Sequence, residues 1–235
     1  MIGFSKSESQ KIKIDIDKLY HYLQQDNFVL VGGLVIRHHL ISRGIDYPPR
    51  PINDLDVIVI NPSLISTLIQ KDFLIYHYHP DNFYLALVDP ITKIKIDIFN
   101  YDPIPQQMEQ IDINNKGVNI ISIEDQLVKT VLDIQRISSK FHVDPKQFLD
   151  MKLLTKIANI KKSNYIWQSH KFKKYPSDIN NAIQRAEKIV AKHPEWLEKN
   201  PFRKKAPYKC IDCKNANGFS IDQMNKIYNI LGYTE

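Results

Sequence analysis

Two aspartates at one strand end are the residues whose types and spacing most directly suggest chemistry. Asp54 and Asp56 stand at the mouth of the apolar run 57–60, whose β-branched residues predict a buried strand. Side chains two residues apart on a strand share a face and lie about 6–7 Å apart along the chain. Two negative charges at that spacing repel unless a cation lies between them, and Mg²⁺ is a usual partner of packed acidic oxygens. The pair therefore indicates either a metal site or two carboxylates that face solvent at a strand end.

A third aspartate lies on a later predicted strand. Residues 93–99 alternate strictly, which places the isoleucines on one face and Lys95, Asp97 and Phe99 on the other. Three carboxylates on neighbouring strands can hold two metal ions about 3.5–4 Å apart, one on a triphosphate and one on an attacking hydroxyl. Asp97 would then contact only the second ion and act on the nucleophile. A slip of one residue in register would instead turn Asp97 into the core.

Two glycines lie between a predicted strand and a predicted helix. Gly32 and Gly33 follow the apolar run 28–31 and precede a helical stretch over 34–42. Without Cβ atoms a ligand can approach the backbone, and a helix N-terminus presents free N–H groups with a positive dipole end. The pair therefore predicts a phosphate cradle, although a tight strand-to-helix turn would need the same residues.

The predicted elements indicate an α/β (α+β) fold, with a mixed sheet flanked by helices and followed by a helical, basic C-terminal region. We expect a catalytic domain over 1–121 and a helical region over 122–235. We expect strands over 28–31, 54–60, 73–78, 83–88, 93–99 and 118–121. We expect helices over 15–25, 34–42, 62–70, 122–137, 145–160, 178–192 and 220–231, with a basic loop over 161–176.

Composition limits the function classes. The 235 residues are 43% hydrophobic and contain two cysteines, which suffices for a core and does not make a disulfide framework. No apolar run reaches the ~20 residues of a membrane span, and the polar start of the chain lacks a signal-peptide core, so we expect a soluble, cytoplasmic protein. Residues 1–160 hold 17 Lys and Arg against 19 Asp and Glu, whereas residues 161–235 hold 15 against 7. This excess, densest over 161–214, predicts either a polyanionic partner or a solvated basic surface.

The order of these motifs resembles the nucleotidyltransferase fold of the DNA polymerase beta superfamily. It is most similar to minimal bacterial nucleotidyltransferases, including the AbiEii-like toxin branch, and the resemblance covers about residues 25–160. Its elements are Gly32-Gly33, Arg50 before Asp54-x-Asp56, Asp97 in a Lys-Ile-Asp-Ile-Phe strand, the helix start at 122–129, and the segment 146–154 with Asp150 and Leu154.

The resemblance implies transfer of a nucleoside monophosphate from an NTP to an acceptor hydroxyl. Asp54 and Asp56 would hold two Mg²⁺ ions and Asp97 the acceptor-side ion. The nucleotide would contact Gly32, Gly33, Arg50, Arg37 and Lys129. The toxin-like branch implies a tRNA acceptor and an antitoxin partner, and the basic C-terminal region favours a nucleic-acid acceptor.

Other interpretations remain open at this point. A small-molecule transferase, of the antibiotic-modifying type, would share the carboxylates and differ in its acceptor pocket. A catalytically inactive binding relative is also open, because Leu34 and Ile52 stand where many relatives carry Ser or Thr. Cys210 and Cys213 have the spacing of half a zinc site, with free thiols as the alternative.

Overall fold

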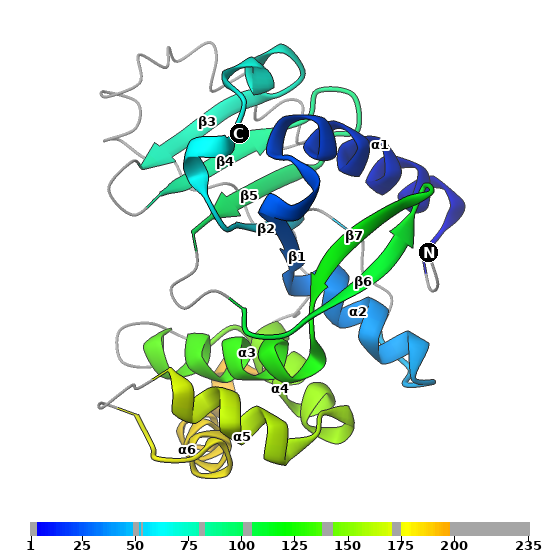
Figure 1. The fold of residues 1–235 in the computed structure, drawn as a ribbon. Coiled ribbons are helices and arrows are strands. Elements are labelled where there is room, and N and C mark those ends of the chain that lie inside the picture. The colour runs from blue at the N-terminus through cyan, green and yellow to red at the C-terminus, as the bar shows by residue number, and fades with distance from the viewer. Residues whose placement is uncertain are drawn as a thin grey trace.

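The computed structural model describes residues 4–48, 52, 54–79, 83–100, 105–137, 143–170 and 175–197 (Figure 1). Arg50, Cys210 and Cys213 and the helix predicted over 220–231 lie outside these residues. Strands β3, β4 and β5 and helix α1 lie in the upper part of Figure 1, and helices α3 to α6 gather below the sheet. None of the helices in the described part of the chain is both long enough and apolar enough to cross a membrane.

A seven-stranded mixed sheet forms the centre of the described residues, in the order β3-β4-β5-β2-β1-β7-β6. β2 runs parallel to β5 and antiparallel to β1, and β1 runs parallel to β7. The strands are β1 (Phe28–Val31), β2 (Asp54–Val59), β3 (Leu74–His79), β4 (Tyr84–Val88), β5 (Lys95–Phe99), β6 (Met108–Ile113) and β7 (Lys116–Ile121). The predicted mixed α/β architecture is confirmed.

Helix α1 (Lys6–Leu23) covers one face of the sheet with a helical stripe that includes Ile12, Ile16 and Leu19, all fully buried. The prediction placed its start at residue 15. That start was wrong, because the helix begins after Ser5, whose side chain and that of Glu8 form a reciprocal capping box.

A buried carboxyl on α1 faces the turn before β5. Asp15 is fully buried and accepts a hydrogen bond from the Thr92 hydroxyl at 2.9 Å. Burial, and then the neighbouring Asp89, raise the pKa of Asp15 to about 8. Asp89 itself accepts hydrogen bonds from the Ile91 N–H and from the Lys18 ammonium. Asp15 is therefore the protonated member of a carboxyl pair that joins α1 to the sheet.

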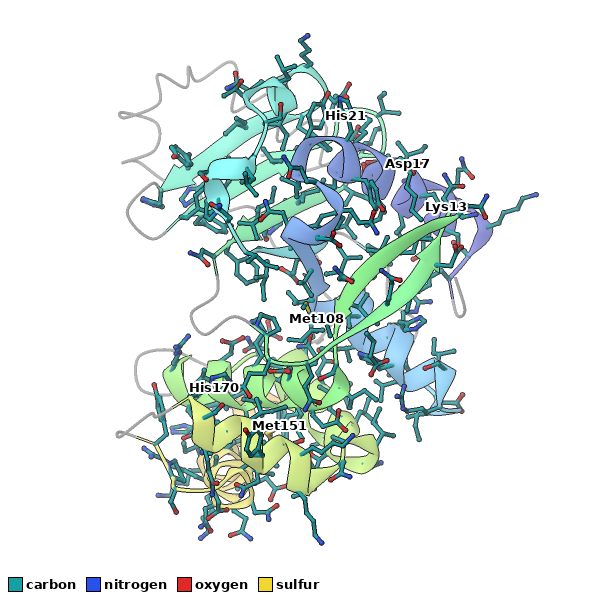
Figure 2. The ribbon with its side chains drawn as sticks, viewed as in Figure 1. Lys13, Asp17, His21, Met108, Met151 and His170 are labelled. Atoms are coloured by element: carbon teal, nitrogen blue, oxygen red, sulfur yellow. The ribbon has the colours of Figure 1, made fainter. Side chains whose placement is uncertain are left out.

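The hairpin between β6 and β7 is closed by a two-residue turn. Asn114 and Asn115 have φ of 60° and 62°, the left-handed conformation that type I′ turns require and that Asn tolerates. The tip of this hairpin contacts α1 through Asp17, which pairs with the Lys116 ammonium at 2.7 Å (Figure 2). β6 was absent from the predicted strands.

The C-terminal half is helical and packs beneath the sheet. It contains α3 (Ile123–Ile137), α4 (Pro145–Ile157), α5 (Ile160–Ser169) and α6 (Ile179–Ala191). The helix predicted over 145–160 is confirmed as α4, which ends at Ile157, but the loop predicted over 161–176 was wrong where α5 occupies it. Ala158, with an extended backbone, ends α4, and Asn159 caps α5 by accepting hydrogen bonds from the N–H groups of Lys161 and Lys162. The helix predicted over 62–70 was also wrong, because two short 3₁₀ segments, Pro62–Leu64 and Thr67–Lys71, occupy this stretch.

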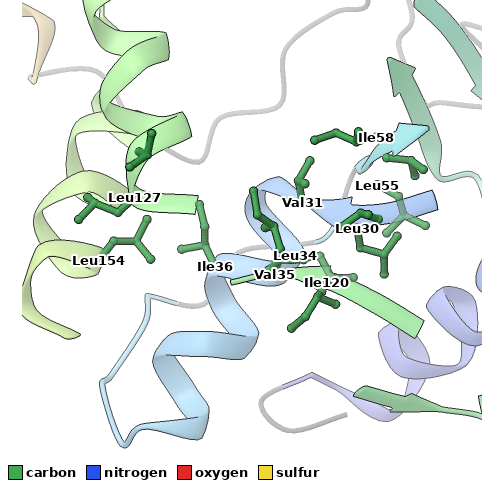
Figure 3. Close-up of a cluster of buried hydrophobic side chains, with 14 of the residues drawn as sticks. Leu30, Val31, Leu34, Val35, Ile36, Leu55, Ile58, Ile120, Leu127 and Leu154 are labelled. Carbon is green, nitrogen blue, oxygen red and sulfur yellow. The ribbon is translucent and has the colours of Figure 1, made fainter. Parts of the chain in front are cut away.

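Helix α2 (Gly32–Ser42) joins the sheet to the helical half. Ile36 on α2 lies between the strand core and the side chains of Leu127 and Leu154 on α3 and α4 (Figure 3). His39 on α2 is fully buried and its Nε2–H donates to the Ile121 carbonyl at 2.8 Å, where β7 ends and α3 begins. A continuous apolar core therefore connects the two predicted parts of the chain, and the boundary at residue 121 stays a prediction.

Candidate active site

The pairing of β2 with β5 brings the three predicted carboxylates to one face of the sheet. Asp56 and Asp97 are direct partners on these parallel strands, and Asp54 is the partner of Lys95. Paired residues on adjacent strands point to the same face, and neighbouring strands lie about 4.8 Å apart. Tyr20 on α1 packs against Phe28 of β1, whereas Val31 of β1 pairs with Asp56. The carboxylates therefore lie on the face opposite α1, and the predicted facing of Asp97 is confirmed.

Gly32 packs directly against the Asp56 carboxylate. Its φ is +72°, and a Cβ added at this position would lie 2.0 Å from Asp56 Oδ2. A side chain here would both strain the backbone and displace the carboxylate. Gly32 opens α2 immediately after Val31, whose side chain cannot cap the first N–H groups of the helix. The structure thus places the glycine turn beside the Asp56 carboxylate, and the phosphate-binding role of Gly32 stays a prediction.

Asp56 is the electrostatic centre of this face. Burial, and then the negative charges of Asp54 and Asp97, raise the pKa of the Asp56 carboxyl to about 7. Lys146 at the start of α4 and Lys129 on α3 oppose this rise. The negative charges of these neighbouring carboxylates exceed the positive charge beside them. A bound divalent cation would stabilise such an arrangement.

Asp97 already has two partners within the protein. Its Oδ2 lies 2.5 Å from the Lys95 ammonium, and its Oδ1 accepts a hydrogen bond from the Tyr84 hydroxyl at 2.9 Å. Burial alone would lower the pKa of Lys95, but Asp97, followed by Asp54 and Asp56, raises it above its usual value. Burial and the charge of Asp97 raise the pKa of Tyr84 above its usual range, so its hydroxyl stays a donor.

These carboxylates fit a first Mg²⁺ ion better than a second. Mg²⁺ is commonly bound by one or two carboxylates, with water and substrate phosphates completing its octahedron. Asp54 and Asp56 supply that donor set. Within the described ranges, however, no three His, Cys, Asp or Glu side chains converge in a geometry that could hold a metal ion. Both oxygens of Asp97 are engaged by Lys95 and Tyr84, so this residue does not fit a further ion as it is placed here.

The predicted cationic contacts are spread over different places. Lys129 lies near enough to Asp56 to affect its charge, and its ammonium is 2.5 Å from Asp133 Oδ2. Arg37 contacts α1, with its guanidinium over the Phe4 ring and 3.8 Å from Glu8 Oε1. The phosphate-binding roles of Gly33, Arg37 and Lys129 stay predictions, as does that of Arg50.

The sequence interpretation missed three residues at this site. Gln126 on α3 is buried, and its Oε1 accepts the Gly32 N–H at 2.9 Å, which joins the glycine turn to the helical half. Lys95 and Lys146 were not named as site residues. The spacing of Lys95 and Asp97 on one strand face predicts that they pair, whereas no local pattern points to Gln126.

Asp150 is one of the residues on which the resemblance rests. Its hydrogen-bond partner is Tyr47, and not one of the three aspartates of the site. It is buried on α4 and accepts a hydrogen bond from the Tyr47 hydroxyl at 2.7 Å. Tyr47 belongs to the segment that leads toward β2. Asp150 therefore joins the helical half to the chain that precedes Asp54.

Comparison with known proteins gives structural neighbours alone. No family model matches the chain, and no curated protein matches it. An antigenic nucleotidyltransferase-like protein from Paracoccidioides brasiliensis is 18% identical, with 90% of this chain and 99% of that one covered and a TM-score of 0.48. The antibiotic-resistance factor ANT(2'')-Ia, solved in solution, is 11% identical, with 82% and 98% covered and a TM-score of 0.49. Identities of 18% and 11% assign no chemistry to this chain.

Proposed function

We propose that this protein is a Mg²⁺-dependent nucleotidyltransferase that moves a nucleoside monophosphate from an NTP to an acceptor hydroxyl. One observation carries the proposal. Asp56 lies between its partner Asp97 on β5 and Gly32 at the start of α2. The residues to which we assign metal binding, the acceptor side and phosphate binding therefore lie within one small region.

Each part of the site has a role in this reaction. A Mg²⁺ ion held by Asp54 and Asp56 would neutralise charge on the triphosphate as pyrophosphate leaves. The N–H groups of the first turn of α2 that follow Gly32, whose own N–H is donated to Gln126, would bind phosphate oxygens, with Arg50 as a predicted further contact. The acceptor oxygen attacks the α-phosphorus, the bond from that phosphorus to the bridging oxygen of pyrophosphate breaks, and Asp97 takes the hydroxyl proton.

For the acceptor we propose RNA, with tRNA as the first candidate. Residues 161–235 carry a net charge of +8. Within the described part of this stretch, exposed cations lie on α5, at Lys161 and Lys162, and on α6, at Arg185 and Lys188. Such a surface attracts the phosphate backbone of a nucleic acid. A toxin role restrained by an antitoxin partner is the more specific proposal that the resemblance implies.

Incubation with NTPs labelled at the α-phosphorus tests this function. The purified protein would be mixed with each NTP, Mg²⁺ and total RNA, and in parallel with a small-molecule extract. We expect label on RNA from the wild type and none from Asp56→Asn, which keeps the size of the side chain and removes its charge. Asp26→Asn, at an exposed carboxylate before β1, is the matched control and should retain transfer. Label on a small molecule would identify the other acceptor class, and equal labelling by Asp56→Asn would contradict the proposed site.

A further inference from the structure

We infer that the ammonium of Lys95 takes the place of the acceptor-side metal ion, so that this site works with one divalent cation held by Asp54 and Asp56. The inference rests on the proposed function and concerns which cations neutralise the three carboxylates of the site. Lys95 would be a positioning residue, because it acts on the acceptor through Asp97. The sequence alone predicts two ions, the second of which would need Asp97 as a ligand.

The geometry around Asp97 supports this reading. The Lys95 Nζ lies 2.5 Å from one carboxylate oxygen and the Tyr84 hydroxyl 2.9 Å from the other. Asp97 is buried, at 8% exposed, and the Lys95 side chain is 25% exposed. A metal ion at Asp97 would have to displace an ammonium from a charge-assisted contact in a poorly solvated place.

The strand register keeps Lys95 in position. Lys95 is the direct partner of Asp54 across the parallel β2–β5 pair, and Asp97 follows two residues later on the same face. The lysine therefore lies beside a carboxylate on each strand. Because it extends from a central strand of the sheet, its backbone is fixed by pairing on both sides, with β2 and with β4.

The formal charges are consistent with one divalent ion. Asp54, Asp56 and Asp97 carry three negative charges when ionised, and Lys95 supplies one positive charge to the same group. The remainder equals the charge of one Mg²⁺. Lys146 and Lys129 lie outside this group of four side chains but still lower the pKa of Asp56, and the ammonium of Lys129 is also paired with Asp133 at 2.5 Å.

In the reaction, the Lys95 ammonium would supply a positive charge beside Asp97, on the side of the site where the acceptor binds. The Lys95 ammonium and the Tyr84 hydroxyl hold the Asp97 carboxylate in one orientation, and each carboxylate oxygen retains a lone pair for a further hydrogen bond. The acceptor hydroxyl can donate to one of these oxygens and pass its proton there as the bond to phosphorus forms. No step on the acceptor side then requires a second metal ion.

Electron paramagnetic resonance with Mn²⁺ tests the inference without relying on turnover. The full chain would be saturated with an NTP analogue that has a methylene group between the α- and β-phosphorus, and Mn²⁺ would be added. Two Mn²⁺ ions about 3.5–4 Å apart give a spin-coupled spectrum, whereas a single ion does not. We expect one Mn²⁺ per nucleotide-bound wild-type protein and no coupling. Lys95→Met should bind two ions and show coupling, because Asp97 Oδ2 then loses its ammonium partner and can act as a ligand while Tyr84 still holds Oδ1.

Two further variants make the result specific. Lys116→Met removes a lysine paired with Asp17 at the hairpin tip, away from the carboxylates, and should bind one ion like the wild type. Asp97→Asn with Lys95 intact should also bind one ion, and this variant decides the question if Lys95→Met does not fold. A coupled spectrum in the wild type that Asp97→Asn abolishes would overturn the inference and leave the proposed function standing. The absence of nucleotide-dependent Mn²⁺ binding would overturn both.

Discussion

Replacing Gly32 with alanine is the change whose effect the structure specifies most closely. The added Cβ would lie 2.0 Å from Asp56 Oδ2, in a residue whose φ is +72°. The left-handed backbone costs a residue other than glycine about 1–2 kcal/mol. Relief of the overlap would move the carboxylate or the turn and cost a further ~1–3 kcal/mol. We therefore expect Gly32→Ala to lower the free energy of unfolding by about 2–5 kcal/mol.

Gly44→Ala separates the two contributions. Gly44 follows α2 with a φ of +71°, and an added Cβ would meet nothing within 4 Å. Gly44→Ala should therefore lower the free energy of unfolding only by the cost of the left-handed backbone, about 1–2 kcal/mol. In a chain of this size each kcal/mol lowers the melting temperature by about 2–4 °C, so calorimetry can resolve the difference between the variants.

The same pair of variants tests the link between Gly32 and the metal site. Titration calorimetry with Mn²⁺ and the NTP analogue should show weakened binding for Gly32→Ala and unchanged binding for Gly44→Ala. Equal losses of stability in the two variants, together with intact Mn²⁺ binding by Gly32→Ala, would refute the reasoning.

Three further perturbations follow from the structure. Because the pKa of Asp15 is raised to about 8, its buried carboxyl lowers stability as pH rises from about 4 to about 8. Asp15→Asn should remove that slope in urea unfolding and gain at least ~2 kcal/mol at pH 8, and an unchanged slope would contradict the assignment. Tyr47→Phe should cost about 1–3 kcal/mol, because it removes a donor from buried Asp150; a loss below the error of unfolding would count against that contact. Reversing the charges of Lys161 and Lys162 should weaken RNA binding and reduce its salt dependence in a filter-binding assay, and an unchanged salt slope would locate the RNA surface elsewhere.

The arrangement of the carboxylates could be predicted because it depends on local patterns. Strict alternation over β5 predicts that Asp97 and Lys95 lie on the same face of the sheet. The spacing of two residues predicts the same for Asp54 and Asp56 on β2. Burial of the isoleucines on the opposite face of β5 makes a slipped register costly, and this is why the predicted facing holds.

The missed features depend on contacts between distant segments. Ala158 leaves the helical conformation and Asn159 caps the next helix through side-chain bonds, which interrupts an otherwise continuous helical pattern. Gln126 is separated from Gly32 by 94 residues, and only the packing of α3 against the sheet brings them together. The hydrogen bond from Tyr84 to Asp97 likewise depends on a distant contact, because it forms only when β4 pairs with β5.

Transfer of label from an NTP marked at the α-phosphorus tests the central claim most directly. We expect that an acceptor gains the α-label, that a γ-label is released as pyrophosphate, and that Asp56→Asn abolishes both while Asp26→Asn does not. An acceptor that gained the γ-label, or transfer that survived in Asp56→Asn, would contradict the claim that Asp54, Asp56 and Asp97 form a nucleotidyltransferase site.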